Sequence, residues 1–268
     1  MRSRTTRLTG RTGLALAAVL LGGLWMASLA WAEYTPPITL AGDHVQFVDV
    51  IESSLTDPVP LYGTPTISGD TLLPAPRDFG SFASAGGVDP TIAKLSTTIE
   101  ALPGTHLLGI RWSQFGDVAL GGLGTADTSV TINAPVFLRI DEINGSPVSG
   151  LSFTANVAFS NLDGSNPGGQ WNLADDGPLA GEVFRGDLDV DLGALLAGEG
   201  LSGSVTKLYF SVDNVLSAQS ESGTYAYIMN TQMSGIEVLT STPEPSTVVM
   251  TLIAAAGMAF WIRRRRPR

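Results

Sequence analysis

The chain has 268 residues, a net charge of −10 and no cysteine. The absence of cysteine excludes disulfides, thiolate metal sites, iron–sulfur clusters and cysteine nucleophiles. Between residues 33 and 243 only six basic residues stand against 24 acidic ones, which favours solubility and argues against nucleic acid as a partner.

The first 32 residues are predicted to be a signal peptide. Four arginines and no acid precede an apolar stretch from Leu14 to about Leu29, and Ala30 and Ala32 supply the small residues of a signal-peptidase site. Cleavage after Ala32 would leave Glu33 as the new N-terminus. The arginines are not consecutive, so ordinary secretion is favoured over a twin-arginine route. The alternative is an uncleaved anchor helix, against which the Ala-x-Ala site argues.

Residues 33–240 are predicted to form an all-β exported domain, an antiparallel β-sandwich or jelly-roll-like fold. Apolar residues recur with a period of two, and 31 glycines and 16 prolines are scattered between the apolar segments as turn signals. The segment 91–101 fits a strand or a helix. The other strands are expected within 44–52, 105–115, 129–140, 151–160, 206–216, 224–230 and 235–240.

Two of these segments, 129–140 and 151–160, predict a β-hairpin joined by the longer loop "DEINGSPVSG". Pro135 lies inside the first segment and indicates an edge strand or a bulge. The residues expected to face the core in these two segments and in 206–216 are Val130, Ile132, Ala134, Val136, Leu138, Ile140, Leu151, Phe153, Ala155, Val157, Phe159, Leu208, Phe210, Val212 and Leu216.

The stretch "GDLDVDLG" offers one candidate site. On a strand, Asp187, Asp189 and Asp191 share one face with neighbours roughly 7 Å apart. Together with loop oxygens they could hold Ca²⁺, or two of them could act as the acid pair of a glycosidase. The favoured interpretation is a half-exposed strand whose acids face water while Leu188, Val190 and Leu192 point to the core.

The loop "NLDGSNPGGQWNLADDG" is the second candidate, for calcium or glycan binding. Trp171 could stack on a sugar, but Asn166 stands where an EF-hand needs glycine, and an ordinary surface loop is favoured. The oxygen-bearing residues of the loop are Asn161, Asp163, Asn166, Asp175 and Asp176. The two histidines, His44 and His106, belong to no catalytic motif and are interpreted as solvated loop residues.

The C-terminus is predicted to be a membrane element. Residues 241–245 form a linker that contains Pro243, Glu244 and Pro245, where two prolines keep the backbone extended. Residues 246–262 carry no charge and would span roughly 25 Å as a transmembrane helix. The basic tail 263–268 would stay cytoplasmic by the positive-inside rule, and its stop signal is Arg263, Arg264, Arg265 and Arg266.

This order of Pro-Glu-Pro, hydrophobic helix and terminal arginines resembles the PEP-CTERM sorting signal of Gram-negative bacteria. The resemblance implies that an exosortase, an inner-membrane cysteine peptidase, cuts near the motif and that the protein continues to the cell surface or extracellular matrix. The segments "SLTDPVPLYGTPTISGD" (54–70) and "LYFSVDNVLSAQSESGTYAYI" (208–228) are similar to β-rich ectodomains that precede this signal. The alternative is a plain single-pass anchor.

The leading functional hypothesis is a non-enzymatic envelope or matrix protein, structural or adhesive in exopolysaccharide and biofilm. Its expected partners are signal peptidase, an exosortase-type peptidase and extracellular polysaccharide. A carbohydrate- or calcium-binding module is the first alternative, and a hydrolase of unknown substrate is the second.

Overall fold

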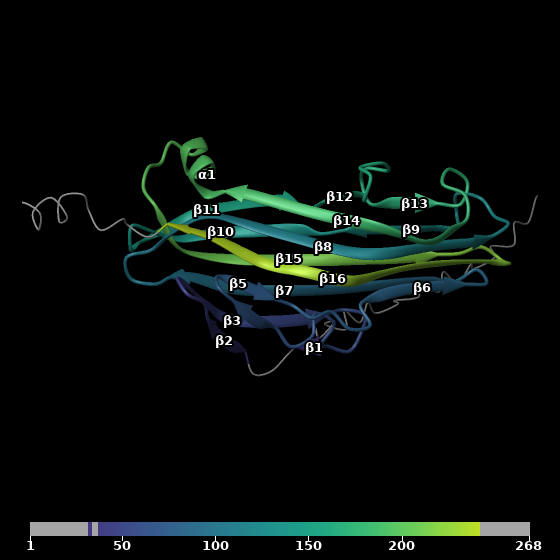
Figure 1. The fold of residues 1–268 in the computed structure, drawn as a ribbon, viewed down its shortest axis with the longest axis horizontal. Helices are drawn as coiled ribbons and strands as arrows, with labels where there is room; N and C mark the ends of the chain where they lie inside the picture. Colours follow the sequence, from purple (N-terminus) through teal and green to yellow (C-terminus); the bar gives the residue numbers. More distant parts are fainter. Residues whose placement is uncertain (1–31, 34–36, 242–268) are drawn as a thin grey trace, which may run out of the picture. The chain divides into compact units, whose positions relative to one another are not determined.

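The computed structural model describes residues 32–33 and 37–241, which form two antiparallel β-sheets and one short helix (Figure 1). Sheet I contains β1 Ala32–Glu33, β2 Ile38–Ala41, β3 Val45–Ser54, β7 Val88–Ala101, β9 Ser129–Asn133, β10 Pro135–Ile143, β11 Ser146–Asn156, β13 Gln170–Asn172 and β15 Val205–Gln219. Sheet II contains β4 Thr66–Ser68, β5 Thr71–Leu73, β6 Gly80–Ser84, β8 His106–Gly122, β12 Ala158–Asn161, β14 Leu179–Asp191 and β16 Thr224–Ser241. The helix is α1 Leu192–Gly198.

Strands β15 and β16, the last two of the described residues, lie in the middle of the two sheets. Strand β15 pairs with β7 on one side and with β9 and β10 on the other, while β16 pairs with β8 on one side and with β5 and β6 on the other. One ladder contact, between Val205 of β15 and Leu107 of β8, joins the sheets at a corner. The predicted antiparallel β-sandwich is therefore confirmed.

Alternation along the strands builds the core between the sheets. The predicted core residues of 129–140 and 206–216 are all buried, as are Val157 and Phe159, whereas Leu151, Phe153 and Ala155 are half-buried. From sheet II, Ile110, Trp112, Val118, Leu120, Ala226 and Ile228 face these residues. Burying a large apolar side chain contributes about 1.5–3 kcal/mol, and such burial must hold a fold that has no cysteine for disulfides.

A buried polar network ties the sheets to the loop that follows β3. Gln114 of β8 donates from Nε2 to Asn214 Oδ1 of β15 at 2.9 Å, and Asn214 Nδ2 donates to the hydroxyl of Tyr62 at 3.0 Å. Trp112 Nε1 donates to Gln114 Oε1 at 3.1 Å. Burial raises the pKa of Tyr62, so its hydroxyl remains a neutral hydrogen-bonding group. The network fixes both sheets and the loop in one arrangement.

The hairpin of β10 and β11 is confirmed, with a shorter connection than the sequence predicted. Asn144 and Gly145 both have positive φ and form a two-residue turn, which matches the right-handed twist of the strands. The expectation of an edge strand or bulge at Pro135 was wrong. Strand β10 lies between β11 and β15, and the register with β15 runs from β9 into β10 without a shift.

Several other predicted boundaries also differ. The segment 151–160 divides into β11 and β12, which lie in different sheets, and the strand expected at 105–115 extends to Gly122. The segments 224–230 and 235–240 are one strand, β16, because bulges near Asn230 and Met233 absorb the irregular residues between them. The ambiguous segment 91–101 lies in strand β7. Strand β14 stops at Asp191, whose side chain accepts a hydrogen bond from Ala194 N at 2.9 Å and caps helix α1.

Candidate functional site

A polar groove lies on the outer face of sheet II. Two hollows of about 650 and 620 Å³ meet at Arg111 and Asp189, which line both. The first hollow crosses β14, β8, β16 and β5, and the second continues towards helix α1. The groove is thus formed by neighbouring strands that come from distant parts of the sequence.

Arg111 is the central charge of the groove. Its Nε lies 3.1 Å from Asp189 Oδ2 on one neighbouring strand, and its Nη1 lies 4.0 Å from Glu237 Oε2 on the other. Arg185 and Asp187 form a second ion pair at 2.5 Å. These half-exposed pairs contribute little to stability because water screens them. The guanidinium N–H groups and carboxylate oxygens that these pairs leave unused can hydrogen-bond a ligand.

Hydroxyl groups add to this polar lining. Ser113 of β8 and Ser234 of β16 hydrogen-bond to each other inside the first hollow, and Ser234 Oγ also donates to Ser113 O at 3.0 Å. Sequence reasoning missed these serines, Arg111 and Glu237. The sequence did contain one signal for the two arginines of the groove. Arg111 and Arg185 are two of only six basic residues between residues 33 and 243, a strongly acidic stretch.

The three acids of "GDLDVDLG" lie on the outer face of β14 and at its end, each with a different partner. Asp187 pairs with Arg185, Asp189 pairs with Arg111, and Asp191 caps helix α1. Within the described part of the chain, no three Asp, Glu or His side chains gather closely enough to hold a metal ion. All three acids therefore line the groove, Asp187 in the first hollow, Asp191 in the second and Asp189 in both.

The less favoured alternative, in which Trp171 stacks on a sugar, is contradicted by its burial. Its ring is 1% exposed and packs on Phe184 at a centroid distance of 5.7 Å, because β13 pairs with β9 and turns the side chain inward. Its Nε1 donates to Asn161 Oδ1 at 2.8 Å. The loop oxygens mainly hold the loop itself together. Their contacts include Ser165 N to Asp163 Oδ1, Asn172 N to Asp176 Oδ2 and Asn172 Nδ2 to Asp175 Oδ2.

His44 lies in a bend before β3 with its side chain 44% exposed, as the sequence predicted, whereas His106 lies in a strand. His44 Nδ1 lies 2.8 Å from Asp70 Oδ2, and its backbone N donates to Asp70 Oδ1 at 2.6 Å. His106 begins strand β8, and its Nδ1 is buried without a hydrogen-bond partner. The contacts of His44 bind a turn to the start of β3 and indicate a structural role.

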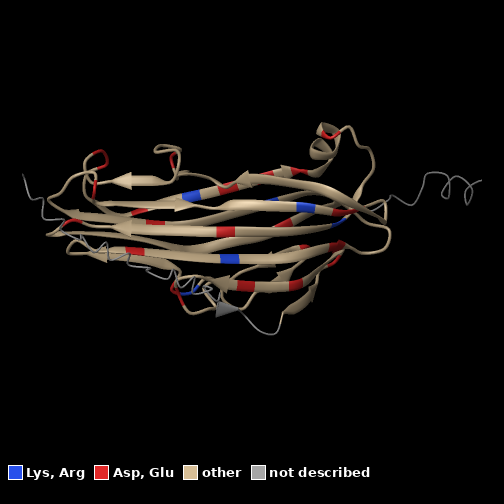
Figure 2. Cartoon of the chain, turned by 180° about the vertical axis from the view of Figure 1, so that it is seen from behind, with Lys and Arg blue, Asp and Glu red and all other residues tan. Residues whose placement is uncertain are grey.

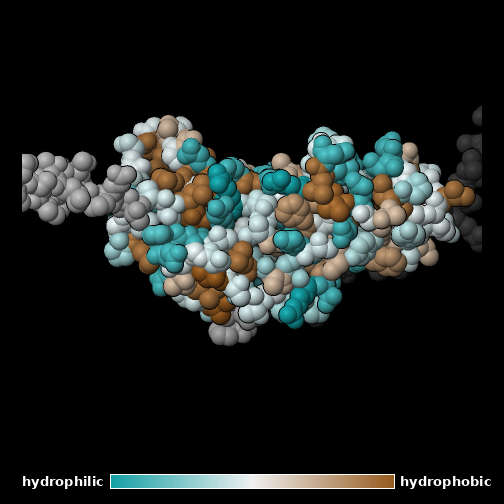
Figure 3. All heavy atoms as spheres, in the orientation of Figure 1, coloured by the Kyte–Doolittle hydropathy of each residue, from teal (hydrophilic) through white to brown (hydrophobic). Residues whose placement is uncertain are grey.

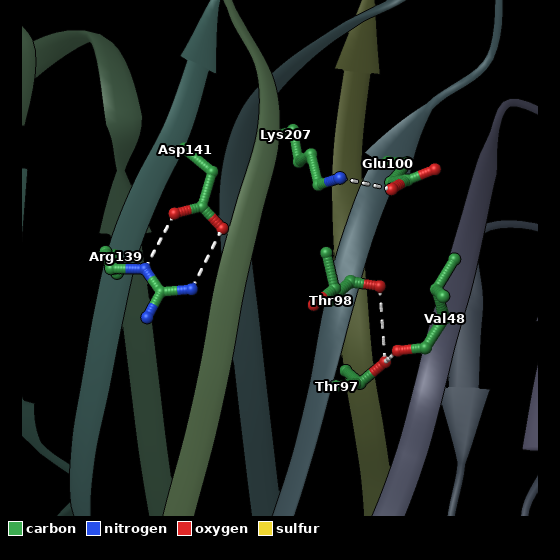
Figure 4. Close-up of polar contacts among 7 residues, drawn as sticks. All are labelled: Val48, Thr97, Thr98, Glu100, Arg139, Asp141 and Lys207. Atoms are coloured by element: carbon green, nitrogen blue, oxygen red, sulfur yellow. Dashed lines mark hydrogen bonds and ion pairs between the residues drawn. The ribbon is translucent and has the colours of Figure 1, made fainter. Parts of the chain in front are cut away.

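The outer face of sheet I carries balanced ion pairs (Figure 4). Arg139 and Asp141 on β10 form two hydrogen bonds, and Lys207 of β15 lies 2.7 Å from Glu100 of β7. Hydrogen bonds to these carboxylates raise the pKa of both Arg139 and Lys207. The Arg139 guanidinium also lies 5.2 Å from the ring centre of Tyr209. The first hollow at Arg111 lies on sheet II, and the second extends to Val205 at the corner where the sheets join.

Most predicted processing residues lie outside the described residues: Ala30, Pro243, Glu244, Pro245, Arg263, Arg264, Arg265 and Arg266. Ala32 and Glu33 form strand β1, which pairs with Ser54 and Ser53 of β3. The predicted transmembrane helix 246–262 also lies outside the described part. Among residues 32–33 and 37–241, no helix is both long and apolar enough to cross a bilayer.

The fold is an antiparallel β-sandwich with a polar groove on one sheet. No protein-family model matches the chain, and no curated protein matches it in sequence. The carbohydrate-binding module TmCBM61, solved in complex with β-1,4-galactotriose, is 8% identical, with 79% of this chain and 92% of that chain covered and a TM-score of 0.23. The family 11 xylanase of Neocallimastix patriciarum is 10% identical, with 79% and 99% covered and a TM-score of 0.21. Likeness at this level carries no argument about a ligand.

Proposed function

We propose that this protein is an exported, non-catalytic polysaccharide-binding protein of the cell surface or extracellular matrix. The observation that carries the proposal is the groove centred on Arg111. It offers guanidinium donors, carboxylate acceptors and hydroxyl groups along an open surface. Ligands with many hydroxyl groups need such a mixture, because each hydroxyl both donates and accepts hydrogen bonds.

The charge balance favours a neutral polymer over a polyanion. The ion-paired lining of the groove combines two arginines with the three carboxylates of Asp187, Asp189 and Glu237. Acidic side chains also outnumber basic ones over the described strands and loops (Figure 2). A polyuronate would therefore meet long-range repulsion on approach, whereas a neutral glycan would not.

The proposal of a non-catalytic role is supported by the partners of the groove acids. A glycosidase needs one carboxyl to donate a proton to the leaving group and a second carboxylate across the scissile bond. Here Asp187 and Asp189 each form an ion pair with an arginine, and Glu237 lies on the other side of the same arginine as Asp189. Each groove carboxylate in these pairs is therefore held against an arginine rather than placed across a gap from a second, unpaired carboxyl.

The proposed route to the surface rests on the two ends of the sequence. A signal peptide ending at Ala32 would direct secretion, and the PEP-CTERM-like order after Thr242 would direct exosortase processing. Both steps would deliver the sandwich to a compartment where extracellular polysaccharide is the abundant polymer.

Titration calorimetry on the protein purified from the secreted fraction tests the binding proposal. The probes are a soluble neutral β-glucan, a neutral galactan and a polyuronate. We expect at least one neutral polymer to bind and Arg111→Ala to weaken that binding about tenfold or more. Arg139→Ala is the matched control, because the two arginines are 50% and 49% exposed and Arg139 lies on the other sheet.

Two results would contradict the proposal. One is the absence of heat with every polymer, and the other is equal weakening by Arg111→Ala and Arg139→Ala. A reducing-end assay on the same mixtures separates binding from hydrolysis. Sugar release that disappears in Asp189→Ala would replace the binding proposal with a hydrolase.

A further inference from the structure

Exposed aromatic rings form a platform on the outer face of sheet II, at the end away from the groove. Phe82 of β6 is 55% exposed and Tyr225 of β16 is 43% exposed. Tyr227 lies two residues along β16 from Tyr225 and directly opposite Phe82. Cross-strand partners share one face of a sheet, so these three residues, here called the aromatic platform, project together.

The neighbouring strand β8 makes room for the rings. Tyr227 and Tyr225 lie opposite Ala119 and Gly121 of β8, which have small side chains or none. A Cβ atom at Gly121 would clash with Cε1 of Tyr225, so the ring occupies the space that a side chain there would fill. The Tyr227 hydroxyl donates to Met229 Sδ at 2.7 Å. The rings of Tyr225 and Tyr227 therefore lie beside small residues of β8, while Phe82 and Tyr225 remain exposed to solvent.

The groove and the platform belong to one continuous face. Arg111, in the groove, and Gly121, beside the platform, lie on the same side of β8 and are roughly 33 Å apart along the strand. Phe115 lies between them, with the Arg185 guanidinium 5.8 Å from its ring centre. A partner that reaches both ends must be extended and must offer both polar and C–H surfaces.

We propose that the aromatic platform is a second subsite for the neutral polysaccharide that the groove binds, an inference that rests on the proposed function. Aromatic ring faces carry partial negative charge and attract the C–H faces of sugar rings, while the groove supplies hydrogen bonds to hydroxyl groups. The acidity of the chain favours the same neutral partner at both places. On the face that Figure 3 shows, the exposed apolar residues occur in several separate groups.

Affinity gel electrophoresis of the secreted protein with the neutral β-glucan and galactan tests this subsite. We expect Tyr225→Ala and Phe82→Ala each to weaken binding about fivefold to tenfold. Tyr225→Phe should retain the affinity of the unmodified protein, because it keeps the ring. Leu123→Ala is the matched control, since this side chain is 97% exposed and lies in the loop after β8. Thermal melting checks that each variant is folded, and Tyr225→Leu keeps the bulk without the ring if Tyr225→Ala unfolds.

The outcomes separate the two proposals. Binding that Arg111→Ala weakens and the ring variants leave unchanged overturns the platform and leaves the groove proposal intact. Absence of binding by the unmodified protein overturns both. Sedimentation velocity tests the alternative that the aromatic platform binds a second copy of this chain. If the ring variants abolish self-association and leave glycan affinity unchanged, the platform is a contact between copies of the chain, and the subsite is overturned.

Discussion

Asp70 illustrates how one side chain joins distant parts of this fold. Its carboxylate accepts hydrogen bonds from the backbone and ring of His44 and, at 3.3 Å, from Thr240 Oγ1 near the end of β16. Burial alone would raise the pKa of Asp70, but the hydrogen bonds and the charge of His44 outweigh it and lower the pKa below its usual value. The ionised carboxylate is therefore the form that stabilises the fold.

Asp70→Asn should lower the free energy of unfolding at pH 7 by about 1 kcal/mol, an amount discounted for solvent screening. A lowered pKa in the folded state stabilises the protein above the unfolded pKa of about 3.9, and this stabilisation disappears as the pH falls through the folded value. Urea denaturation between pH 7 and pH 3 measures the effect. The variant should lose less stability on acidification than the unmodified protein, and parallel pH curves would contradict this assignment.

Glu52 should respond to pH in the opposite sense. Its carboxylate is 4% exposed and accepts hydrogen bonds from the backbone N of Leu61 and of Tyr62, but burial outweighs these bonds and raises its pKa. The stability linked to this group is present below the unfolded pKa and is lost as the pH rises through the folded value. Glu52→Gln, which keeps a carbonyl acceptor, should raise the unfolding free energy at pH 7 by about 1 kcal/mol.

Glu52→Ala is the companion variant, because it also removes the charge but leaves both amides unpaired. It should destabilise the protein by about 1–3 kcal/mol in the same denaturation experiment. A result in which Glu52→Gln is as unstable as Glu52→Ala would mean that the charge itself holds the loop after β3.

The residue scale is also where the sequence was least informative. Trp171 lies in a loop rich in glycine, asparagine and aspartate, where exposure was a reasonable expectation, yet pairing of β13 with β9 turns the ring inward. Tyr225 and Tyr227 alternate with buried residues, and this alternation in the sequence could have predicted that both rings face outward. The placement of Phe82 beside them depends on pairing between β6 and β16, strands from distant parts of the chain, and no local pattern encodes that pairing.

Among the strands, β16 shows how β-bulges interrupt the alternation of buried and exposed residues by which a strand is predicted. Its alternation shifts near Asn230 and again near Met233, so one long strand resembles two short ones. Gly235 follows the second shift and has a φ of +86°. A Cβ at this position would clash with the carbonyl oxygen of Leu72 on β5. The bulge therefore permits a close contact between β16 and β5.

Gly235→Ala should destabilise the protein by clearly more than about 1 kcal/mol, because it combines an unfavourable φ with a backbone clash. Gly181→Ala is the control that isolates the clash, since Gly181 has a φ of +87° and no atom within 4 Å of the position that a Cβ would occupy. Guanidinium denaturation of both variants gives the comparison. Equal destabilisation of Gly235→Ala and Gly181→Ala would show that β5 shifts to accommodate the added methyl group and that the clash costs nothing further.

Periodicity identified most elements, because strands with one buried face repeat every two residues. The same reasoning left 91–101 undecided between strand and helix, since Thr and Ile dominate it and suit a sheet without excluding a helix turn. The structure shows that this segment is a strand, because β7 pairs with both β3 and β15. Local patterns therefore indicated the long strands but missed the short strands β2, β4, β5, β6 and β13. The pairing partners that create the groove lie far apart in sequence.

At the scale of the whole molecule, the proposed sorting route predicts the ends of the finished protein. Replacing Pro243, Glu244 and Pro245 by alanines should leave unprocessed precursor in the inner membrane, because the peptidase would lose its extended recognition peptide. Pro147→Ala, at an exposed position of β11, is the control and should be processed normally. Mass spectrometry of the secreted protein should show Glu33 as the first residue and no Arg268, and retention of Arg268 would contradict the route.

The central position of β15 and β16, the last two strands of the described residues, has a consequence for the order of folding events on the proposed export route. Because β15 completes the middle of sheet I and β16 the middle of sheet II, neither layer can close until the chain has emerged beyond Ser241. On the proposed export route, cooperative folding would therefore begin only after residue 241 has crossed the membrane, and the waiting polypeptide would expose strand edges that attract proteases or holding chaperones. A version terminated at Gln219 should accordingly be cleared by periplasmic proteolysis, which pulse–chase labelling would measure as a lifetime far shorter than that of the full chain.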